Sequence, residues 1–168
     1  MRRSDSMSES ATIPPEQAVE EEPRIPTRRL LAFEVGGSVF ACDMESFREI
    51  VPTQRTTRLP GAPDSVCGLI NLRGTIVTVI DGGIVLGKPP CAKTSGLILL
   101  ADYFERLVGV GVDDVRDIHE IPIDQFASAE APESIGEGIV TGVVEIDGKR
   151  VMVLDITALV QKVIGQGR

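Results

Sequence analysis

Hydrophobic residues in this chain fall into short runs of strand length that are joined in pairs across turns. Four such pairs span residues 28–44, 67–81, 95–115 and 139–156, and their runs are rich in β-branched residues. Paired apolar runs around a short turn are typical of β-hairpins. The turns are expected at Gly36-Gly37, Arg73-Gly74, Phe104-Glu105 and Asp147-Gly148. The pattern therefore predicts a fold built mainly from β-hairpins.

The segments between the hairpins predict single strands, loops and little helix. Arg48–Pro52 and residues 116–122 are each typical of one strand, and residues 82–88 hold one short helical turn. Residues 56–65 contain two prolines and predict an extended connection, whereas residues 125–138 are polar and predict a long loop.

The two ends of the chain differ in composition. Residues 1–27 are rich in Pro, Glu, Ala and Thr with little to bury, which predicts a disordered N-terminal tail. Folded sequence is expected from 28 to 165. Its last part has a helical pattern, with Thr157 or Asp155 as the N-cap and Gly165 past the helix end.

The two halves of the folded sequence repeat one pattern. When Gly68 is aligned with Gly142, "GLINLRGTIVTVID" lies on "GVVEIDGKRVMVLD". The identical positions are Gly68/Gly142, Gly74/Gly148, Val77/Val151, Val79/Val153 and Asp81/Asp155. Each half, about 28–90 and about 94–165, then consists of a hairpin, a strand, a linker, a hairpin and a short helix. Such a repeat indicates that one supersecondary unit is used twice.

Five short strands per repeat are suited to a small closed barrel, which leaves no sheet edge exposed. We therefore expect an all-β fold of two five-stranded β-barrel subdomains packed together, with short helices and a C-terminal helix. Each barrel alone, at about 65 residues, would have a marginal core. The repeat leaves open whether each half forms its own barrel or the two halves exchange strands.

Charge and composition argue against two classes of partner. The formal net charge is -8, and the 168 residues include five Phe, one Tyr and no Trp. An acidic chain disfavours phosphate backbones and anionic lipids, and so few aromatic residues offer little for stacking on bases. No apolar run reaches the length of a membrane span. We expect neither nucleic-acid binding nor direct membrane insertion.

Residues with catalytic or metal-binding chemistry are sparse. Cys42, Cys67 and Cys91 are widely spaced without a CxxC pair, which favours free, buried cytosolic thiols over a metal site. His119 is the only histidine, and the sequence has no Walker loop, HExxH or GxSxG motif. No cofactor, metal or catalytic residue is expected. The alternative of another class is a small enzyme that uses Cys67 or a pair of carboxylates.

Three stretches, "FEVGGSVFACDMESFREIV", "LPGAPDSVCGLINLRGTIVTVID" and "LVGVGVDDVRDI", together resemble the CheW family of chemotaxis coupling proteins. The resemblance covers the chain from about Leu30 to Val163. It implies two SH3-like barrels and a non-catalytic adaptor that couples chemoreceptors to a CheA-type histidine kinase in a chemosensory two-component pathway.

The resemblance also implies partners and a location. The partners would be the cytoplasmic tip of a chemoreceptor and the regulatory domain of the kinase. The protein would be cytoplasmic and recruited to membrane-bound receptor arrays. The alternative within the family is an adaptor of a non-flagellar chemosensory system, in twitching or developmental signalling.

The family pattern assigns roles to individual residues. Receptor binding is implied for Phe47, Glu49, Arg73, Gly109, Val115, Ile118 and Gly142. By analogy with the fold of the kinase, kinase binding is expected at Arg55, Thr56, Thr57, Arg58 and Gly68. Structural roles are expected for Asn71, Gly74, Asp81 and Gly148. Two departures, the large Phe47 and the Gly82-Gly83 pair after the "VID" strand, bear on which receptors are accepted.

An arginine at the crest of an apolar hairpin leads to two hypotheses. The Arg73 guanidinium offers five donors in a planar fork, which suits a carboxylate or carbonyl groups on the receptor. Alternatively, Arg73 pairs with Glu49 and holds the binding groove in shape. Under either hypothesis Arg73→Glu is expected to do more damage than Arg73→Ala, because a reversed charge repels what a truncation only fails to attract.

Overall fold

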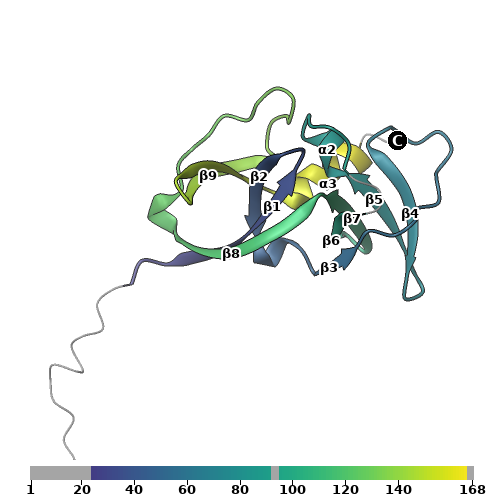
Figure 1. Ribbon diagram of the computed structural model, residues 1–168, viewed down its shortest axis with the longest axis horizontal. Helices are drawn as coiled ribbons and strands as arrows, with labels where there is room; N and C mark the ends of the chain where they lie inside the picture. Colours follow the sequence, from purple (N-terminus) through teal and green to yellow (C-terminus); the bar gives the residue numbers. More distant parts are fainter. Residues whose placement is uncertain (1–23, 92–94, 166–168) are drawn as a thin grey trace, which may run out of the picture.

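The computed structural model describes residues 24–91 and 95–165, and ten β-strands dominate this part of the chain (Figure 1). The strands are β1 (Thr27–Val35), β2 (Ser38–Asp43), β3 (Glu49–Pro52), β4 (Val66–Leu72), β5 (Thr75–Asp81), β6 (Leu97–Tyr103), β7 (Arg106–Val112), β8 (Asp114–Pro122), β9 (Val140–Ile146) and β10 (Lys149–Leu154). The helices are α2 (Gly82–Val85), α3 (Ile156–Ile164) and the 3-10 turns η2 (Met44–Ser46) and η3 (Ile123–Gln125). Most of the predicted tail lies outside the described residues.

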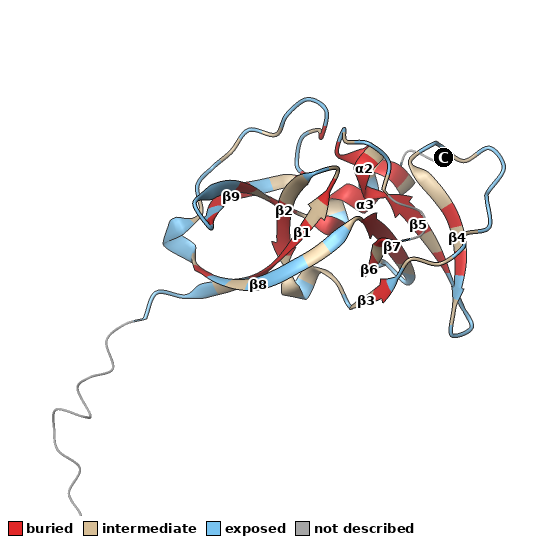
Figure 2. Ribbon diagram, in the orientation of Figure 1, coloured by how far each residue is buried: buried red, intermediate tan, exposed pale blue. Residues whose placement is uncertain are grey.

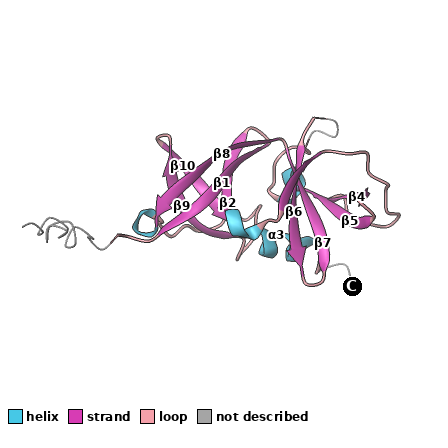
Figure 3. Cartoon of the chain, turned by 90° about the horizontal axis from the view of Figure 1, so that it is seen from below, coloured by secondary structure: helices cyan, strands magenta, loops and turns pink. Residues whose placement is uncertain are grey.

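These strands form two five-stranded sheets, and each sheet closes on itself. Barrel 1 has the strand order β8-β1-β2-β10-β9, and barrel 2 has the order β3-β6-β7-β5-β4. Figure 3 shows the two groups of strands side by side. Ala127 closes barrel 1 by exchanging two backbone hydrogen bonds with Val143, of 2.9 and 2.8 Å. Thr57 closes barrel 2 in the same way on Leu69, with two bonds of 2.8 Å. The predicted all-β fold of two five-stranded barrels is confirmed.

The barrels do not coincide with the two sequence repeats. The first hairpin of the chain, β1–β2, pairs with β8 and β10 from the second half. In return the hairpin β6–β7 of the second half pairs with β3 and β5 from the first half. The two halves therefore exchange their leading hairpins. This answers the question, left open by the sequence, of whether the halves exchange strands. Each exchange is joined by a parallel strand pair, β2–β10 or β7–β5.

The aligned glycines of the two repeats lie at equivalent points where the barrels close. A Cβ atom on Gly68 would lie 2.3 Å from the carbonyl oxygen of Thr57, and one on Gly142 would lie 3.0 Å from that of Ala127. Gly68 also has a φ of +143°, which a side chain rarely adopts. Both glycines thus let the closing segment approach the strand beneath it.

The aligned aspartates begin the two helices. The Asp81 carboxylate accepts hydrogen bonds from the backbone N–H groups of Gly83 and Ile84, at 2.8 and 3.2 Å, and caps α2. The Asp155 carboxylate accepts one bond of 3.1 Å from the N–H of Ala158 and caps α3. Of the two expected N-caps for the last helix, the structure has Asp155. Side-chain oxygens at these positions satisfy N–H groups that have no partner within the helix.

Three apolar clusters make up the core of the described residues. Barrel 1 encloses one of them and barrel 2 another. The largest, here called the inter-barrel core, lies between the two barrels and includes the buried face of α3. Figure 2 shows this burial where the barrels meet, whereas β8 and the tip of the β4–β5 hairpin are exposed. Since both barrels contribute to this shared core, the chain behaves as one folded unit.

Candidate functional site

The sequence "NLRG" forms the tip of the β4–β5 hairpin at one end of barrel 2. Arg73 and Gly74 are its two turn residues and both have positive φ, 51° and 86°, as in a type I′ turn. The Asn71 side-chain oxygen accepts a hydrogen bond of 2.9 Å from the Gly74 N–H and holds the turn closed. The expected structural roles of Asn71 and Gly74 are therefore visible in the geometry. The arginine side chain is left at the outer surface.

That side chain turns toward β3. The Arg73 Nη2 atom donates a hydrogen bond of 2.5 Å to Oε2 of Glu49. The bond raises the pKa of the Arg73 guanidinium above its ordinary value, because the neighbouring carboxylate favours the charged form. The arginine side chain is 68 % exposed, and its bond to Glu49 uses one of its five N–H donors, so others remain for a partner. The internal pair with Glu49 exists, and it leaves donor capacity for a second acceptor.

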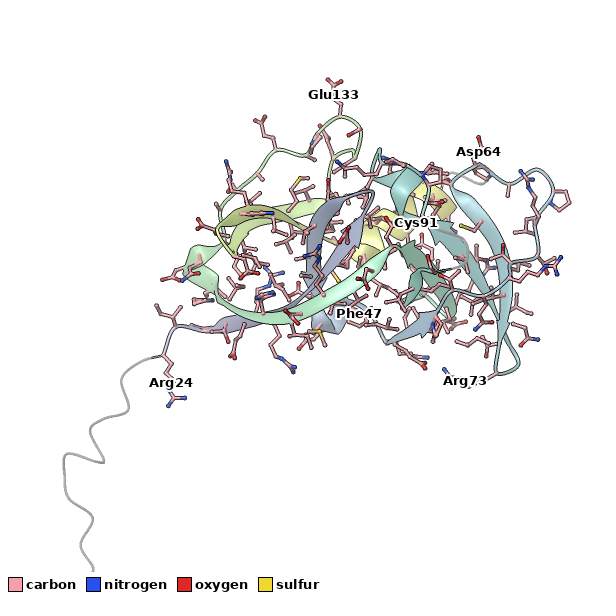
Figure 4. The ribbon with its side chains drawn as sticks, viewed as in Figure 1. Arg24, Phe47, Asp64, Arg73, Cys91 and Glu133 are labelled. Atoms are coloured by element: carbon pink, nitrogen blue, oxygen red, sulfur yellow. The ribbon has the colours of Figure 1, made fainter. Side chains whose placement is uncertain are left out.

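Two of the apolar residues assigned to receptor binding border the inter-barrel core. Phe47, after η2, and Val115, on β8, are partly buried and pack against it. Figure 4 places Phe47 beside the junction of the barrels and Arg73 at the end of barrel 2. Ile118, also on β8, is 48 % exposed.

A β-bulge explains how Val115 and Ile118 share one face of β8. Side chains three residues apart on a regular strand point to opposite faces. Here the pairing of β8 with β1 shifts between Leu31 and Phe33, so that Val115 lies opposite Phe33 and Ile118 opposite Leu31. Leu31 and Phe33 both belong to the inter-barrel core. Val115 and Ile118 therefore extend that core toward the surface along β8.

The two glycines assigned to receptor binding are buried and lie apart. Gly109 is on β7 of barrel 2, where a Cβ atom would lie 2.5 Å from Cγ2 of Ile98 inside the barrel. Gly142 is on β9 of barrel 1, beneath Ala127. Gly109 lies in a different barrel from Val115, Ile118 and Gly142, because the hairpin exchange assigns β7 to barrel 2 and β8 and β9 to barrel 1. Neither glycine presents a side chain to a partner.

The segment assigned to kinase binding crosses the middle of β4 in barrel 2, where Thr57 pairs with Leu69. Arg55, Thr57 and Arg58 are exposed, whereas Gly68 is buried beneath Thr57. The Thr56 hydroxyl donates a bond of 3.4 Å to the carbonyl of Cys67. This segment forms part of the wall of a cavity of about 780 Å³ that reaches Val79 and Ile98 in the core of barrel 2. A cavity of this size with an apolar floor can take large apolar side chains.

Two polar groups that line this cavity, Asp81 and Cys91, are in unreactive states. The Asp81 carboxylate is 4 % exposed, and its Oδ1 atom accepts from three backbone N–H groups, those of Gly83, Ile84 and Cys91. Burial raises the pKa of the Cys91 thiol to about 12, with Asp81 adding to the effect. A neutral thiol is a weak nucleophile, and a carboxylate that already accepts several hydrogen bonds is a weak base. The three cysteines form no disulfide, and only Cys42 is buried, while Cys67 and Cys91 are partly exposed.

Two features near the receptor-site residues are not among the sequence assignments. Arg48 and Asp102 form an ion pair of 3.2 Å between β6 and the residue before β3. Tyr103, at the end of β6, packs against the inter-barrel core beside the exposed Phe104. A phenylalanine at the first position of a two-residue hairpin turn, where small polar residues are usual, is the sequence signal that indicates Phe104.

Within residues 24–91 and 95–165, no group of three or more His, Cys, Asp and Glu side chains is placed to hold a metal ion. No helix in the same part of the chain is both long enough and apolar enough to cross a membrane.

Comparison with known proteins gives one consistent family. A family model described as "CheW-like domain" matches residues 29–163. The probable chemotaxis protein CheW of Rhizobium etli is 30% identical over 134 residues, which cover 79% of this chain and 86% of the relative. Protein PilI of Pseudomonas aeruginosa is 29% identical over 104 residues, or 61% of this chain and 58% of PilI.

A solved structure agrees with the fold. The scaffolding protein TtCheW from Thermoanaerobacter tengcongensis superimposes with a TM-score of 0.72 at 22% identity, and the match covers 83% of this chain and 90% of that one. This likeness confirms the predicted pair of SH3-like barrels. Because the family model spans almost all of the described sequence, the chain belongs to the CheW-like family.

Proposed function

We propose that this chain is a non-catalytic scaffold of a chemotaxis pathway that couples chemoreceptors to a CheA-type histidine kinase. The observation that carries the proposal is the family match over residues 29–163, which takes in both barrels and the core between them. A scaffold acts by holding partners in place and needs surfaces rather than reactive groups. The protein would work in the cytoplasm at membrane-bound receptor arrays.

The proposed receptor surface combines an apolar and a charged part. Phe47, Val115 and Ile118 supply apolar contacts where the barrels meet, and Arg73 with Glu49 supplies a hydrogen-bonding group at the end of barrel 2. An exposed guanidinium that already holds one carboxylate is preoriented, so less side-chain entropy is lost when a second acceptor binds. Arg73 then serves both as a brace for Glu49 and as an anchor for the receptor.

The proposed kinase surface is the segment Arg55–Arg58 with the adjoining cavity. Arg73 precedes the start of β5, and Asp81, which lines the cavity, is the last residue of that strand. The seven residues of β5 rise about 3.3 Å each, so Arg73 and the Asp81 end of the cavity lie about 20 Å apart. Thr57 is nearer, because it pairs with Leu69, four residues before Arg73. The cavity end of barrel 2 therefore offers a second partner room away from Arg73.

Two alternatives fit the observations less well. The similarity to PilI suits an adaptor of a non-flagellar system, but that match covers 61% of the chain against 79% for the chemotaxis protein of R. etli. A small enzyme that uses Cys67 or paired carboxylates would need an activated group in the cavity. The carboxylate at its floor, Asp81, is instead committed to backbone N–H groups.

The test is a binding measurement by calorimetry and sedimentation with two partners, the regulatory domain of a CheA-type kinase and a soluble receptor-tip fragment. Native protein is expected to bind both, separately and together. Arg73→Glu should weaken binding of the receptor fragment only. Failure of the native protein to bind either partner would overturn the proposal.

The matched control for this test is Arg116→Glu. Arg116 and Glu34 form an ion pair of 2.6 Å with similar exposure, but in barrel 1. Glu34 alternates with Phe33 and Val35, both in the inter-barrel core, so this pair lies on the opposite face of β1. Arg116→Glu is expected to bind both partners like the native protein.

A further inference from the structure

Phe104 occupies the tip of the β6–β7 hairpin in a conformation that costs the fold stability. Its side chain is 87 % exposed, and its φ is +55°. Tyr103 pairs with Arg106, so Phe104 and Glu105 form a two-residue turn, and of these two only Phe104 has positive φ. That is the pattern of a type II′ turn, whose first position is normally glycine. An exposed phenyl ring thus stands where glycine would fit better.

The matching hairpin in the other repeat makes the contrast direct. The β1–β2 turn has Gly36 at the equivalent first position, with a φ of +56°. Gly37, the second residue of that turn, also has positive φ (+80°), so the two turns differ in type, but their first positions share the same φ, which glycine adopts without strain. Residues held in sparsely populated conformations cluster at functional sites, where the side chain is retained for another purpose. Burial cannot be that purpose for Phe104, because almost all of its side chain faces solvent.

The ring is held in place on one side. Tyr103 and Phe104 meet edge to face, with ring centroids 4.8 Å apart and an interplanar angle of 79°. Tyr103 in turn packs against the inter-barrel core. The contact limits the orientations of the Phe104 ring and so lowers the entropy that is lost when its free face is covered.

The ring lies at the same end of barrel 2 as Arg73. β5 and β7 run parallel, with Thr78 opposite Val108, so the turns that precede them are at the same end of the sheet. The ion pair of Arg48 with Asp102, two residues before Phe104, joins this hairpin to β3 and hence to Glu49. Ile76, on the strand after the Arg73 turn, is 60 % exposed at this end.

We propose that Phe104 is an aromatic anchor for the receptor, which extends the receptor surface from Arg73 and Glu49 to the tip of β6–β7. The proposal rests on the function proposed above. The fitting partner is the receptor tip of the function proposed above, with an apolar groove on its surface that accepts one planar ring. A carboxylate beside that groove would complement Arg106, which makes no ion pair with the described residues.

The test uses the opposite effects of one substitution on stability and on binding. Phe104→Gly relieves the turn and is expected to raise Tm by about 2–4 °C. The same variant should weaken binding of the receptor fragment about 30-fold, the usual loss for an aromatic anchor, and leave kinase binding unchanged. Phe104→Tyr should restore receptor binding. Asp147→Gly makes the same change to glycine at a turn position with a φ of +51°, in the β9–β10 hairpin, and should leave receptor binding unchanged.

Three results would overturn the proposal. Native receptor affinity in Phe104→Gly would show that the ring has no part in that complex. Loss of kinase binding instead would assign the ring to the other partner, and self-association that disappears in Phe104→Gly would assign it to a second copy of this chain. If the native protein itself does not bind the receptor fragment, the function proposed above fails first, which separates the two outcomes.

Discussion

Arg73 and Glu49 connect the two edges of the sheet that forms barrel 2. Glu49 begins β3, the first strand in the sheet order, and Arg73 is in the turn after β4, the last strand. Their hydrogen bond of 2.5 Å continues the closure that Thr57 and Leu69 make farther along the same edges. The pair is largely exposed, so solvent screening keeps its contribution to stability small. Its main effect is to fix the position of a guanidinium on the surface.

Exchange of the charges between positions 49 and 73 should separate the brace from the anchor. In the double variant Glu49→Arg with Arg73→Glu, the internal ion pair can still form, but the two charges have changed places. We expect Tm near the native value, whereas receptor binding falls about tenfold or more because the anchor has the wrong sign. Calorimetric titration and thermal unfolding measure the two effects. Recovery of native receptor affinity in the double variant would show that Arg73 only holds Glu49 in place and does not itself bind the receptor.

Gly68→Ala should open barrel 2. The new Cβ atom would lie 2.3 Å from the Thr57 carbonyl oxygen, and the φ of +143° is unfavourable for alanine. We expect a loss of about 3 kcal/mol in the free energy of unfolding and weaker kinase binding, because Thr57 lies in the proposed kinase segment. Urea unfolding gives the first quantity.

Gly142→Ala is the matched control for this change. The equivalent distance to the Ala127 carbonyl oxygen is 3.0 Å, and Gly142 is not among the residues with positive φ. Its expected cost is smaller, about 1 kcal/mol, with no effect on kinase binding. Equal losses in the two variants would contradict the view that backbone conformation, and not only space, requires glycine at position 68.

The structure shows which parts of the fold follow from local sequence. All four hairpin turns were expected at the residues where they occur, because turn formation depends on a few neighbouring residues. The exchange of hairpins was not predictable, because barrels with exchanged hairpins and barrels without exchange satisfy the same strand patterns and the same turns. It depends on which strands bury their outer faces in the inter-barrel core, a long-range property of the whole chain.

The candidate site could also be predicted only in part, because some of its geometry depends on long-range strand pairing. The pair of Arg73 with Glu49 was one of two sequence hypotheses, and "NLRG" correctly indicated an exposed hairpin tip. The shared face of Val115 and Ile118 depends on a bulge opposite Leu31 and Phe33, and no residue type in β8 signals it. Gly109 leaves space for Ile98 inside barrel 2. The sequence alone does not distinguish such a packing role from a role at the receptor surface.

Asp81→Ala should destabilise the protein more than Asp155→Ala, although both remove a helix N-cap. Asp81 is 4 % exposed and also accepts from the Cys91 N–H, so its loss leaves buried donors without a partner. We expect about 3 kcal/mol for Asp81→Ala and about 1 kcal/mol for Asp155→Ala. Asp81→Asn keeps one acceptor oxygen and should lie between these values. Denaturant unfolding of the three variants would contradict this order if Asp155→Ala cost the most.

The buried thiol of Cys42 should make stability fall at alkaline pH. Burial raises the pKa of Cys42 from an ordinary value of 9.0 to about 12. The unfolded chain therefore loses this proton at lower pH than the folded protein. The stabilising contribution is complete below pH 9 and is lost as the pH rises toward 12, by up to about 1.4 kcal/mol per pH unit. Cys91 should add a smaller effect of the same sign because it is partly exposed.

Cys42→Ala provides the comparison, because other groups also ionise in this range. The difference in unfolding free energy between native and variant protein should be constant from pH 6 to about 8.5 and should shrink above it. Iodoacetamide at pH 8 should modify Cys42 far more slowly than a free thiol, since the side chain is buried and neutral. A difference that stays constant up to pH 11, or rapid modification of Cys42 in the native protein, would show that this thiol is accessible to solvent and not enclosed in the inter-barrel core.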